Sequence, residues 1–307
     1  MKIHKGLDSF KKLSKAVVTT GTFDGVHLGH KKILTQLNDI SKKQGIETVL
    51  ITFFPHPRIV LFPDHELKLI NTIDENIALF KTCNIDHLIF QTFDKEFSRT
   101  TSLEYIRDIL LKKIGLSDLV IGYNHHFGRN REGSIENLEE YGELYGFNIH
   151  EVDSYNLDNK SVSSTKIRKA LNAGNIELAN EYLGYNFKLM GLIVKGKGFG
   201  KKMGFPTANL HVENKNKIIP LEGVYAVHVY YQNHKFQGML NIGLNPTFNH
   251  GKLAIEVHIF DFNQDIYGES IQLEFIKRIR NEKKFEKIDD LKHQLSLDKI
   301  AALNILT

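Results

Sequence analysis

The feature that most constrains the fold is a change in hydrophobic periodicity about three fifths of the way along the chain. From Ala16 to Val152, short apolar runs alternate with segments of helical spacing. Past about Lys188, the apolar runs follow one another with turns between them, and a helical pattern appears only near the end. The first pattern indicates a parallel sheet with helices on both faces, and the second an antiparallel barrel or sandwich. The sequence therefore predicts two domains, residues 1–185 and 186–307.

The expected elements follow from apolar spacing and from glycine and proline stops. In the first half we expect strands at residues 16–20, 48–54, 87–90, 118–121 and 147–152, and helices at residues 31–44, 74–82, 103–113 and 135–145. In the second half we expect strands at residues 223–231, 235–242, 254–260 and 270–276, and a helix at residues 288–294. Residues 165–183, between the halves, predict two short helices broken by Gly174.

Composition narrows the class of protein. The 307 residues are 41% hydrophobic and 25% charged, without a run of roughly 18 apolar residues, and the first 13 lack the apolar core of a secretory signal. One cysteine, Cys83, excludes an internal disulfide and a multi-cysteine zinc site. The net charge of +4 is mild and the longest basic clusters are short, which disfavours a general nucleic-acid protein, while a site for small anions fits this charge equally well. We expect a soluble cytoplasmic protein with no membrane or nucleic-acid partner; composition does not indicate its oligomeric state.

The segment Gly21 to His30 stands between the first predicted strand and the first predicted helix, and reads Gly-Thr-Phe-Asp-Gly-Val-His-Leu-Gly-His. Its glycines let the backbone turn sharply, and the free N–H groups and dipole of a helix start attract anions. Histidines at 27 and 30 would face one pocket, where either could donate to a phosphate oxygen. Ligands of parallel sheets bind beyond the carboxyl ends of the strands, which is where this segment lies.

This string resembles the nucleotidyltransferase superfamily, whose mark is His-x-Gly-His. Three further segments extend the likeness: Phe53 to Pro57, Gly122 to Gly128, and Ser163 to Arg168. All four in this order resemble the adenylyltransferase half of the bacterial bifunctional riboflavin kinase/FMN adenylyltransferase (FAD synthetase) family. The resemblance implies a Rossmann-like domain in which the histidines stabilise the transition state as a phosphate attacks the α-phosphorus of ATP, without a covalent enzyme intermediate.

The resemblance also assigns roles to residues of the first half. It implies that His27 and His30 are catalytic and that the flavin is bound by Pro55, His56 and Pro57. It implies that ATP is bound by Gly21, Phe23, Asp24, His27, His30, Asn124, Ser164, Thr165 and Arg168. Family members often carry an acid at the position of Tyr123 and Phe at that of His125, so contacts at these two positions stay open. A metal site at His125 and His126 is disfavoured, because adjacent residues of an extended chain point different ways.

The second glycine-rich segment runs from Gly196 to Asn209 and also carries several lysines. It fails the Walker pattern, because position 195 is Lys rather than Gly and position 202 is Lys rather than Ser or Thr. It fails the Rossmann fingerprint as well, since no helix is expected after it. Glycines still allow a concave cradle of N–H groups, while a following threonine or asparagine offers oxygen to hydrated magnesium. We expect a phosphate site that includes Gly198, Gly200 and Lys201.

Gly204 to Asn209 (Gly-Phe-Pro-Thr-Ala-Asn) resembles the signature of riboflavin kinases, as do several later segments, among them residues 223–226, 241–247, 256–258 and 280–285. The resemblance implies a six-stranded barrel. It implies that Thr207 and Asn209 hold Mg-ATP, that Glu256 takes the proton from the ribityl 5′-hydroxyl, and that Arg280 and Glu282 contact the flavin. Asn281 stands where the family has Asp.

The predicted function is the conversion of riboflavin to FMN by the barrel and of FMN to FAD by the first domain, with ATP and Mg²⁺ in both steps. Two alternatives stay open. In one, only the adenylyltransferase is active and the barrel is a flavin-binding regulatory module. In the other, the chain is a non-enzymatic nucleic-acid or flavin binder that uses the lysine-rich loop.

Overall fold

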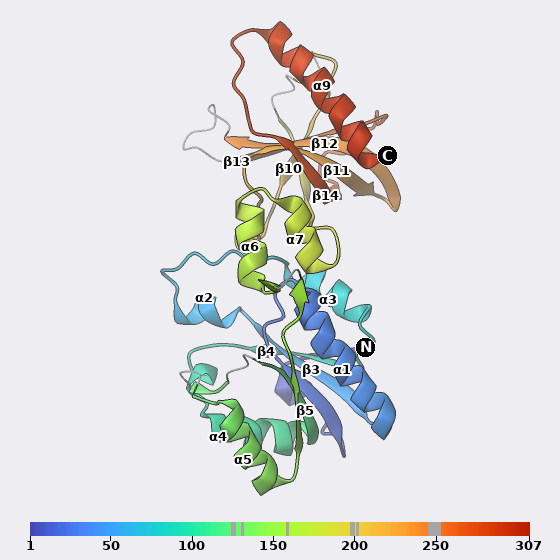
Figure 1. The fold of residues 1–307 in the computed structure, drawn as a ribbon. Helices are drawn as coiled ribbons and strands as arrows, with labels where there is room; N and C mark the ends of the chain where they lie inside the picture. Colours follow the sequence, from blue (N-terminus) through green and yellow to red (C-terminus); the bar gives the residue numbers. More distant parts are fainter. Residues whose placement is uncertain (124–126, 130–131, 158–159, 197–199, 201–202, 245–252) are drawn as a thin grey trace. The chain divides into compact units, whose positions relative to one another are not determined.

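The computed structural model describes residues 1–123, 127–129, 132–157, 160–196, 200, 203–244 and 253–307 (Figure 1). These residues form two compact units: residues 1–67 with 72–163, and residues 68–71 with 164–307. The first unit contains a parallel sheet with helices, and the second contains a closed antiparallel barrel of six strands, so the predicted fold class is confirmed.

The sheet of the first unit has the strand order β1-β4-β3-β2-β5-β6, with every pairing parallel. Its strands are β1 (Lys2–Lys5), β2 (Ala16–Thr20), β3 (Glu47–Phe54), β4 (His87–Thr92), β5 (Leu116–Gly122) and β6 (Asn148–Val152). Its helices include α1 (Leu28–Gln44), α2 (Pro57–Leu61), α3 (Ile73–Lys81), α4 (Ser102–Glu104), the π-helix Tyr105–Ile114 and α5 (Ile135–Tyr145). The short strands β7 (Asn156–Leu157) and β8 (Lys160–Ser161) pair with each other.

Both faces of this sheet are covered by helices, because strand β2 is apolar on both sides. Val17 packs in one core cluster with Leu34 of α1 and Phe80 of α3. Its neighbour Val18 packs in the opposite cluster with Leu110 of the π-helix. Strand β2 lies between β3 and β5, so the chain runs outward through β3 and β4 and then continues on the other side at β5. That reversal is the switch point at which open α/β sheets bind ligands, beyond the carboxyl ends of the strands.

The barrel of the second unit closes in the order β10-β13-β12-β11-β14-β9. Its strands are β9 (Lys188–Val194), β10 (Ala208–His211), β11 (Gly223–Tyr231), β12 (His234–Leu244), β13 (Leu253–Ile259) and β14 (Ser270–Arg280). Its helices include α6 (Ser164–Asn172), α7 (Ile176–Leu183) and α9 (Ile288–Leu306). Helix α9 covers part of the outer face, where its Ala302 packs against Met239 and Phe260.

Helices α6 and α7 pack with the barrel in the structure. The Asn180 side chain of α7 donates to the carbonyl oxygen of Phe275 at 2.9 Å and accepts from the backbone N–H of Phe187 at 2.7 Å. The short segment Lys68–Asn71 also belongs to this unit, because the buried Lys217 ammonium donates to the Ile70 carbonyl at 2.7 Å. A functional division of the chain at residue 185 stays a prediction.

The structure adds elements to those expected and changes the type or the bounds of others. Strands β1, β9 and β10 were not predicted; β1 is a largely exposed edge, and β10 is only four residues long. The predicted helix at 103–113 is mostly a π-helix, and the final helix continues to Leu306 instead of ending at residue 294.

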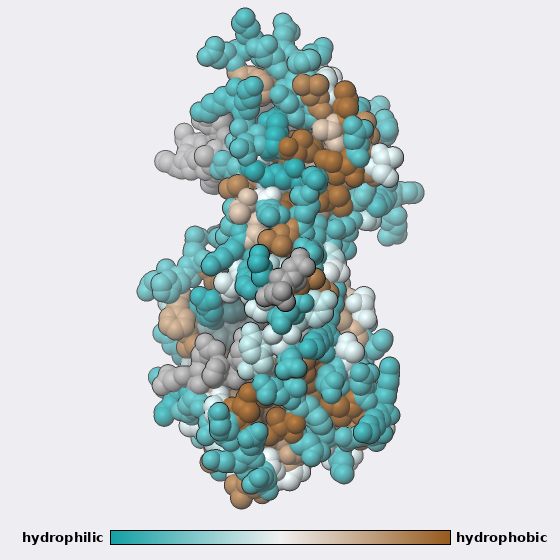
Figure 2. All heavy atoms as spheres, viewed as in Figure 1, coloured by the Kyte–Doolittle hydropathy of each residue, from teal (hydrophilic) through white to brown (hydrophobic). Residues whose placement is uncertain are grey.

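Among the described residues, no helix is both long and apolar enough to cross a membrane. The face drawn in Figure 2 is mostly hydrophilic, with hydrophobic residues gathered in patches. On helix α9 the exposed apolar side chains are Ile288, Leu297 and Ile300.

Candidate active sites

The loop after strand β2 is held in an unusual backbone shape. Phe23 and Val26 have φ angles of 46° and 37°, in a region that side chains rarely adopt, yet both are buried. The Val26 N–H donates to the Phe23 carbonyl at 3.0 Å and closes the turn, which also contains the buried Asp24. Strained backbone that is held in place by packing is common at functional sites. Here the strained turn leads directly into the start of α1.

His27 caps helix α1. Its Nδ1 accepts from the backbone N–H of His30 at 3.3 Å, so the proton of the neutral ring lies on Nε2. Gly29 lies against this ring, because a Cβ at that position would meet Cε1 of His27 at 3.1 Å. Gly21 similarly makes room for the Phe23 ring, which an added Cβ would meet at 3.1 Å. Both glycines therefore have a packing reason within the motif.

The His30 ring stacks on His27, with ring centroids 3.6 Å apart and planes inclined by 17°. Phe23 lies 5.0 Å from the His30 ring. Burial, and then the neighbouring His27, hold the pKa of His30 well below its ordinary value. Its Nδ1 atom is buried and has no hydrogen-bond partner among the residues that the structure describes. The predicted pair thus meets at a helix N-terminus, with His30 uncharged at neutral pH.

Two of the other first-half segments follow strands β3 and β5, which lie on either side of β2, at the same edge of the sheet. His56 caps the short helix α2, with Nδ1 accepting from the Arg58 N–H at 3.1 Å, and Pro55 and Pro57 flank it. Strand β3, which they follow, pairs in parallel with β2. Tyr123 follows β5 and is 47% exposed. Asn124, which was predicted to bind ATP, lies outside the described residues.

The predicted ATP-binding residues Ser164, Thr165 and Arg168 lie in the first turns of helix α6, in the unit of the barrel. Thr165 is exposed and Arg168 is half-buried, while Ile167 faces the core. Their part in the nucleotide site stays a prediction.

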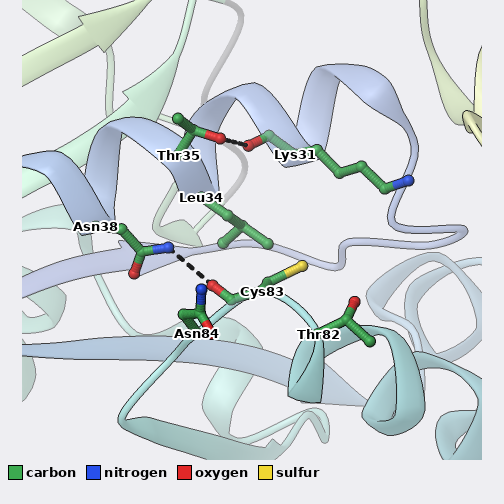
Figure 3. Close-up of a pocket in the computed structure, with 7 residues that line it drawn as sticks. All are labelled: Lys31, Leu34, Thr35, Asn38, Thr82, Cys83 and Asn84. Carbon is green, nitrogen blue, oxygen red and sulfur yellow. Dashed lines mark hydrogen bonds between the residues drawn. The ribbon is translucent and has the colours of Figure 1, made fainter.

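A cavity of about 340 Å³ lies between α1 and the turn after α3 (Figure 3). The Asn38 side chain on one wall donates to the carbonyl oxygen of Cys83 on the other at 2.8 Å. No residue of either predicted site lines this cavity, whose lining is Lys31, Leu34, Thr35, Asn38, Thr82, Cys83 and Asn84.

In the barrel, the glycine-rich segment folds back on the residues that follow it. A Cβ on Gly196 would overlap the Asn209 amide, and a Cβ on Gly200 would meet the Thr207 hydroxyl at 3.3 Å. The Phe205 N–H donates to the Gly200 carbonyl at 2.9 Å. Small residues are therefore needed for the loop to lie against Thr207 and Asn209. Gly198 and Lys201 lie outside the described residues.

Strand register brings Glu256 to these residues. Asn209 of β10 is the cross-strand partner of Glu256 on β13, and Asn241 of β12 is its partner on the other side. Such partners share one face of a sheet, with Cβ atoms about 4.5–5.5 Å apart. The Thr207 hydroxyl donates to Glu256 Oε2 at 3.5 Å. Burial raises the pKa of the half-buried Glu256 carboxyl, and the Thr207 hydrogen bond partly opposes this.

The predicted flavin residues lie at the end of β14 and just beyond it. The Arg280 guanidinium binds the buried Asp298 of α9 through two nitrogens, at 2.8 and 2.7 Å, and its third donates to the Asn281 carbonyl. Glu282 is exposed, and a Cβ on Gly243 would overlap its carboxylate. Arg280 therefore fastens α9 to the barrel in this structure, and flavin contact by Arg280 and Glu282 stays a prediction.

Two residues beside Glu256 were given no role in the sequence analysis. Asn241 and His258 lie on the strand face that carries Glu256, and the His258 ring binds the Pro206 carbonyl at 2.7 Å. The period of two along a strand would place His258 beside Glu256. Only the fold shows that Pro206, 52 residues earlier, lies within reach.

The fold and the two sites define a two-domain transferase with a nucleotidyltransferase-like sheet and a flavin-kinase-like barrel. Family models agree with this class: the model for FAD synthetase matches residues 9–166, and the model for riboflavin kinase matches residues 183–306. Curated proteins named bifunctional riboflavin kinase/FMN adenylyltransferase align over nearly the whole chain. The protein from Buchnera aphidicola subsp. Schizaphis graminum is 40% identical, covering 97% of this chain and 96% of the relative.

The protein of that name from Escherichia coli strain K12 is 33% identical, covering 98% and 97% of the two chains, and that from Bacillus subtilis strain 168 is 34% identical, covering 94% and 92%. The chain belongs to the bifunctional riboflavin kinase/FMN adenylyltransferase family. A crystal structure described as a macrolide-efflux protein from Streptococcus pneumoniae has the same fold, with a TM-score of 0.91 and 31% identity, covering 99% and 98% of the chains.

Proposed function

We propose that this chain makes FAD from riboflavin in two steps, each using one ATP. The barrel transfers the γ-phosphoryl group to riboflavin and gives FMN, and the first domain joins FMN to AMP and releases pyrophosphate. The observation that carries the kinase step is the convergence of Thr207, Asn209 and Glu256 on neighbouring strands. The convergence of His27 and His30 at a helix start supports the second step.

In the kinase step, Glu256 accepts the proton of the ribityl 5′-hydroxyl as that oxygen bonds to the γ-phosphorus and ADP leaves. A positioned base contributes about 10²–10⁴ in rate, and a raised pKa makes its carboxylate a stronger proton acceptor. Burial gives Glu256 this property. Thr207 and Asn209 hold the nucleotide at the edge of β10.

In the adenylyl step, a phosphate oxygen of FMN bonds to the α-phosphorus of ATP, and pyrophosphate leaves from the opposite side. His27 and His30 donate N–H groups to phosphate oxygens on which charge develops. Their neighbour, the N-terminus of α1, adds free N–H groups and the favourable end of a helix dipole.

Magnesium fits the barrel site through oxygen donors, since the Thr207 hydroxyl lies 3.5 Å from the Glu256 carboxylate and Asn209 is the cross-strand partner of Glu256. Within the described part of the chain, no group of three or more His, Cys, Asp or Glu side chains could form a protein-only metal site. A magnesium ion held mainly by ATP phosphates, with one or two protein oxygens, suits this arrangement and would neutralise the triphosphate. We further propose that residues 1–185 form the adenylyltransferase domain and 186–307 the kinase domain, in a cytoplasmic enzyme.

Product analysis tests the proposal. The purified chain is incubated with Mg-ATP and either riboflavin or FMN as the sole flavin, and the products are separated by chromatography. We expect FMN and then FAD from riboflavin, and FAD with pyrophosphate from FMN. FAD from FMN but no FMN from riboflavin would leave the barrel a regulatory module. No turnover of either flavin would overturn the proposal.

A further inference from the structure

We propose that His258 is a positioning residue of the kinase site, where it holds the peptide that leads into Thr207 so that the Thr207 hydroxyl stays beside Glu256. This inference rests on the kinase activity proposed for the barrel. His258 lies two residues after Glu256 on strand β13, so both side chains project from the same face.

The contact that carries the inference is a hydrogen bond between distant parts of the chain. Nδ1 of His258 lies 2.7 Å from the carbonyl oxygen of Pro206. A carbonyl oxygen can only accept, so Nδ1 must carry the hydrogen. This donor is present in both the neutral and the protonated ring, so the bond does not depend on the charge of His258.

The His258 ring packs edge-on against two aromatic side chains. Phe205 lies 5.4 Å from it at an interplanar angle of 70°, and Phe260 lies 5.5 Å from it at 64°. His258 is buried, and burial is the largest cause that lowers its pKa; Lys299 of α9 acts in the same direction, whereas Asp261 and the Pro206 bond oppose them. A buried, neutral ring with one defined tautomer holds its partner at a fixed place.

The position of the bond explains why it is needed. The ladder between β10 and β13 begins at the pair Ala208 and Val257, and Thr207 lies just outside it. Pro206 has no N–H and therefore cannot extend the ladder as a donor. Its carbonyl oxygen instead accepts the hydrogen bond from His258 of β13, which fixes the segment just before β10. The next residue in this segment is Thr207, whose hydroxyl lies 3.5 Å from the Glu256 carboxylate. A displacement of about 1 Å in such a site can reduce the rate up to a hundredfold.

A matched pair of variants tests the donor. His258→Asn keeps an N–H near the position of Nδ1, whereas His258→Leu has a similar branched shape and no donor. We expect His258→Leu to raise KM for Mg-ATP and to lower kcat/KM of FMN formation about tenfold or more. His258→Asn should recover most of this loss. The conversion of FMN to FAD by the same protein should stay at the wild-type rate in both variants, which shows that the first unit is folded and that the defect is confined to the barrel.

The pH profile of FMN formation gives a readout that packing alone would not move. Burial raises the pKa of Glu256, and the Thr207 hydrogen bond partly opposes this rise. If Thr207 moves away in His258→Leu, that pKa rises, and the acidic limb of kcat/KM shifts to higher pH; in His258→Asn the limb should stay in place. Kinase kinetics and a pH profile in His258→Leu like those of the wild type, or equal defects in the two variants, would overturn the inference.

A measurement on the wild-type chain covers the case in which His258→Leu does not fold. Nitrogen-15 NMR of the imidazole rings should show His258 with its proton on Nδ1 at neutral pH. A proton on Nε2 would leave no donor toward Pro206 and would overturn the inference. Failure of the wild-type chain to form FMN would instead overturn the proposed kinase activity.

Discussion

The two sites differ in how far apart in the sequence their main residues lie. His27 and His30 are three residues apart and meet because one ends a turn and the other lies in the first turn of α1. Thr207 and Glu256 are 49 residues apart and meet only because β10 pairs with β13 in one register. The first site therefore depends on local backbone shape, and the second on the alignment of strands.

The sites also differ in how burial acts on their ionisable groups. Burial lowers the pKa of His30 and raises that of Glu256, since in both cases it disfavours the charged form. An uncharged imidazole is a hydrogen-bond donor that fits between phosphate oxygens. A carboxylate that is costly to keep ionised is a stronger base. The same physical cause therefore supports the proposed phosphate binding in one unit and the proposed proton removal in the other.

The largest expected effect separates the sites directly. Glu256→Ala should lower kcat for FMN formation by about 10²–10⁴, because the proton of the attacking hydroxyl then has no positioned acceptor. FAD formation from supplied FMN should be unchanged. Glu274→Ala is the control, since Glu274 is also a barrel-strand carboxylate but binds the Tyr230 hydroxyl instead. A wild-type rate of FMN formation in Glu256→Ala would remove this residue from the role of base.

The converse variant comes next in size. His30→Ala should lower FAD formation by about 10²–10³, the usual cost of removing one preorganised donor from a developing charge. Coupled assays should show riboflavin still converted to FMN, which accumulates. His65→Ala, an exposed histidine of the same unit, is the control. Loss of both activities in a folded His30→Ala protein would contradict the separation of the two sites.

The difference between the sites also explains what the sequence could predict. The histidine motif was placed correctly at the start of a helix because strand, turn, cap and helix are all read from adjacent residues. The run of strands predicted an antiparallel barrel or sandwich, and the family resemblance implied a barrel of six strands, but β9 and β10 were missed. The bond from His258 to Pro206 could not be predicted, because it needs the pairing of β10 with β13.

The ion pair of Arg280 could not be predicted from the sequence for the same reason, because its partner lies on another element. Sequence likeness gives it a flavin role, but in the fold its guanidinium is paired with Asp298, 18 residues later on α9. The chain from 281 to 287 between them has no regular helix or strand, so no periodicity shows where α9 will pack. The contacts of a residue in the fold must be known before a ligand-binding role can be distinguished from a structural one.

A smaller effect tests the local shape of the first site. Gly29→Ala places a Cβ about where it would press on the His27 ring, at 3.1 Å from Cε1. We expect FAD formation to fall about tenfold, because the ring must shift from the donor geometry. FMN formation should be unchanged, and since alanine favours helix over glycine the first unit should unfold no more easily. Unchanged FAD formation would show that the His27 ring moves without cost.

The smallest expected effect compares stability with activity in the second site. Since burial raises the pKa of Glu256 in the folded chain, ionisation costs stability as pH rises from the unfolded-state value through the folded-state value. Glu256→Gln removes that cost while keeping the side chain's shape, so at neutral pH the unfolding free energy should increase by about 1 kcal/mol. Below pH 4.5, the ordinary value for this carboxyl, the gain should disappear because the wild-type carboxyl is protonated. Thermal unfolding of both proteins at pH 4 and pH 7.5 measures the difference. Equal stability at pH 7.5 would mean that Glu256 is ionised at no cost and that its basicity has another source.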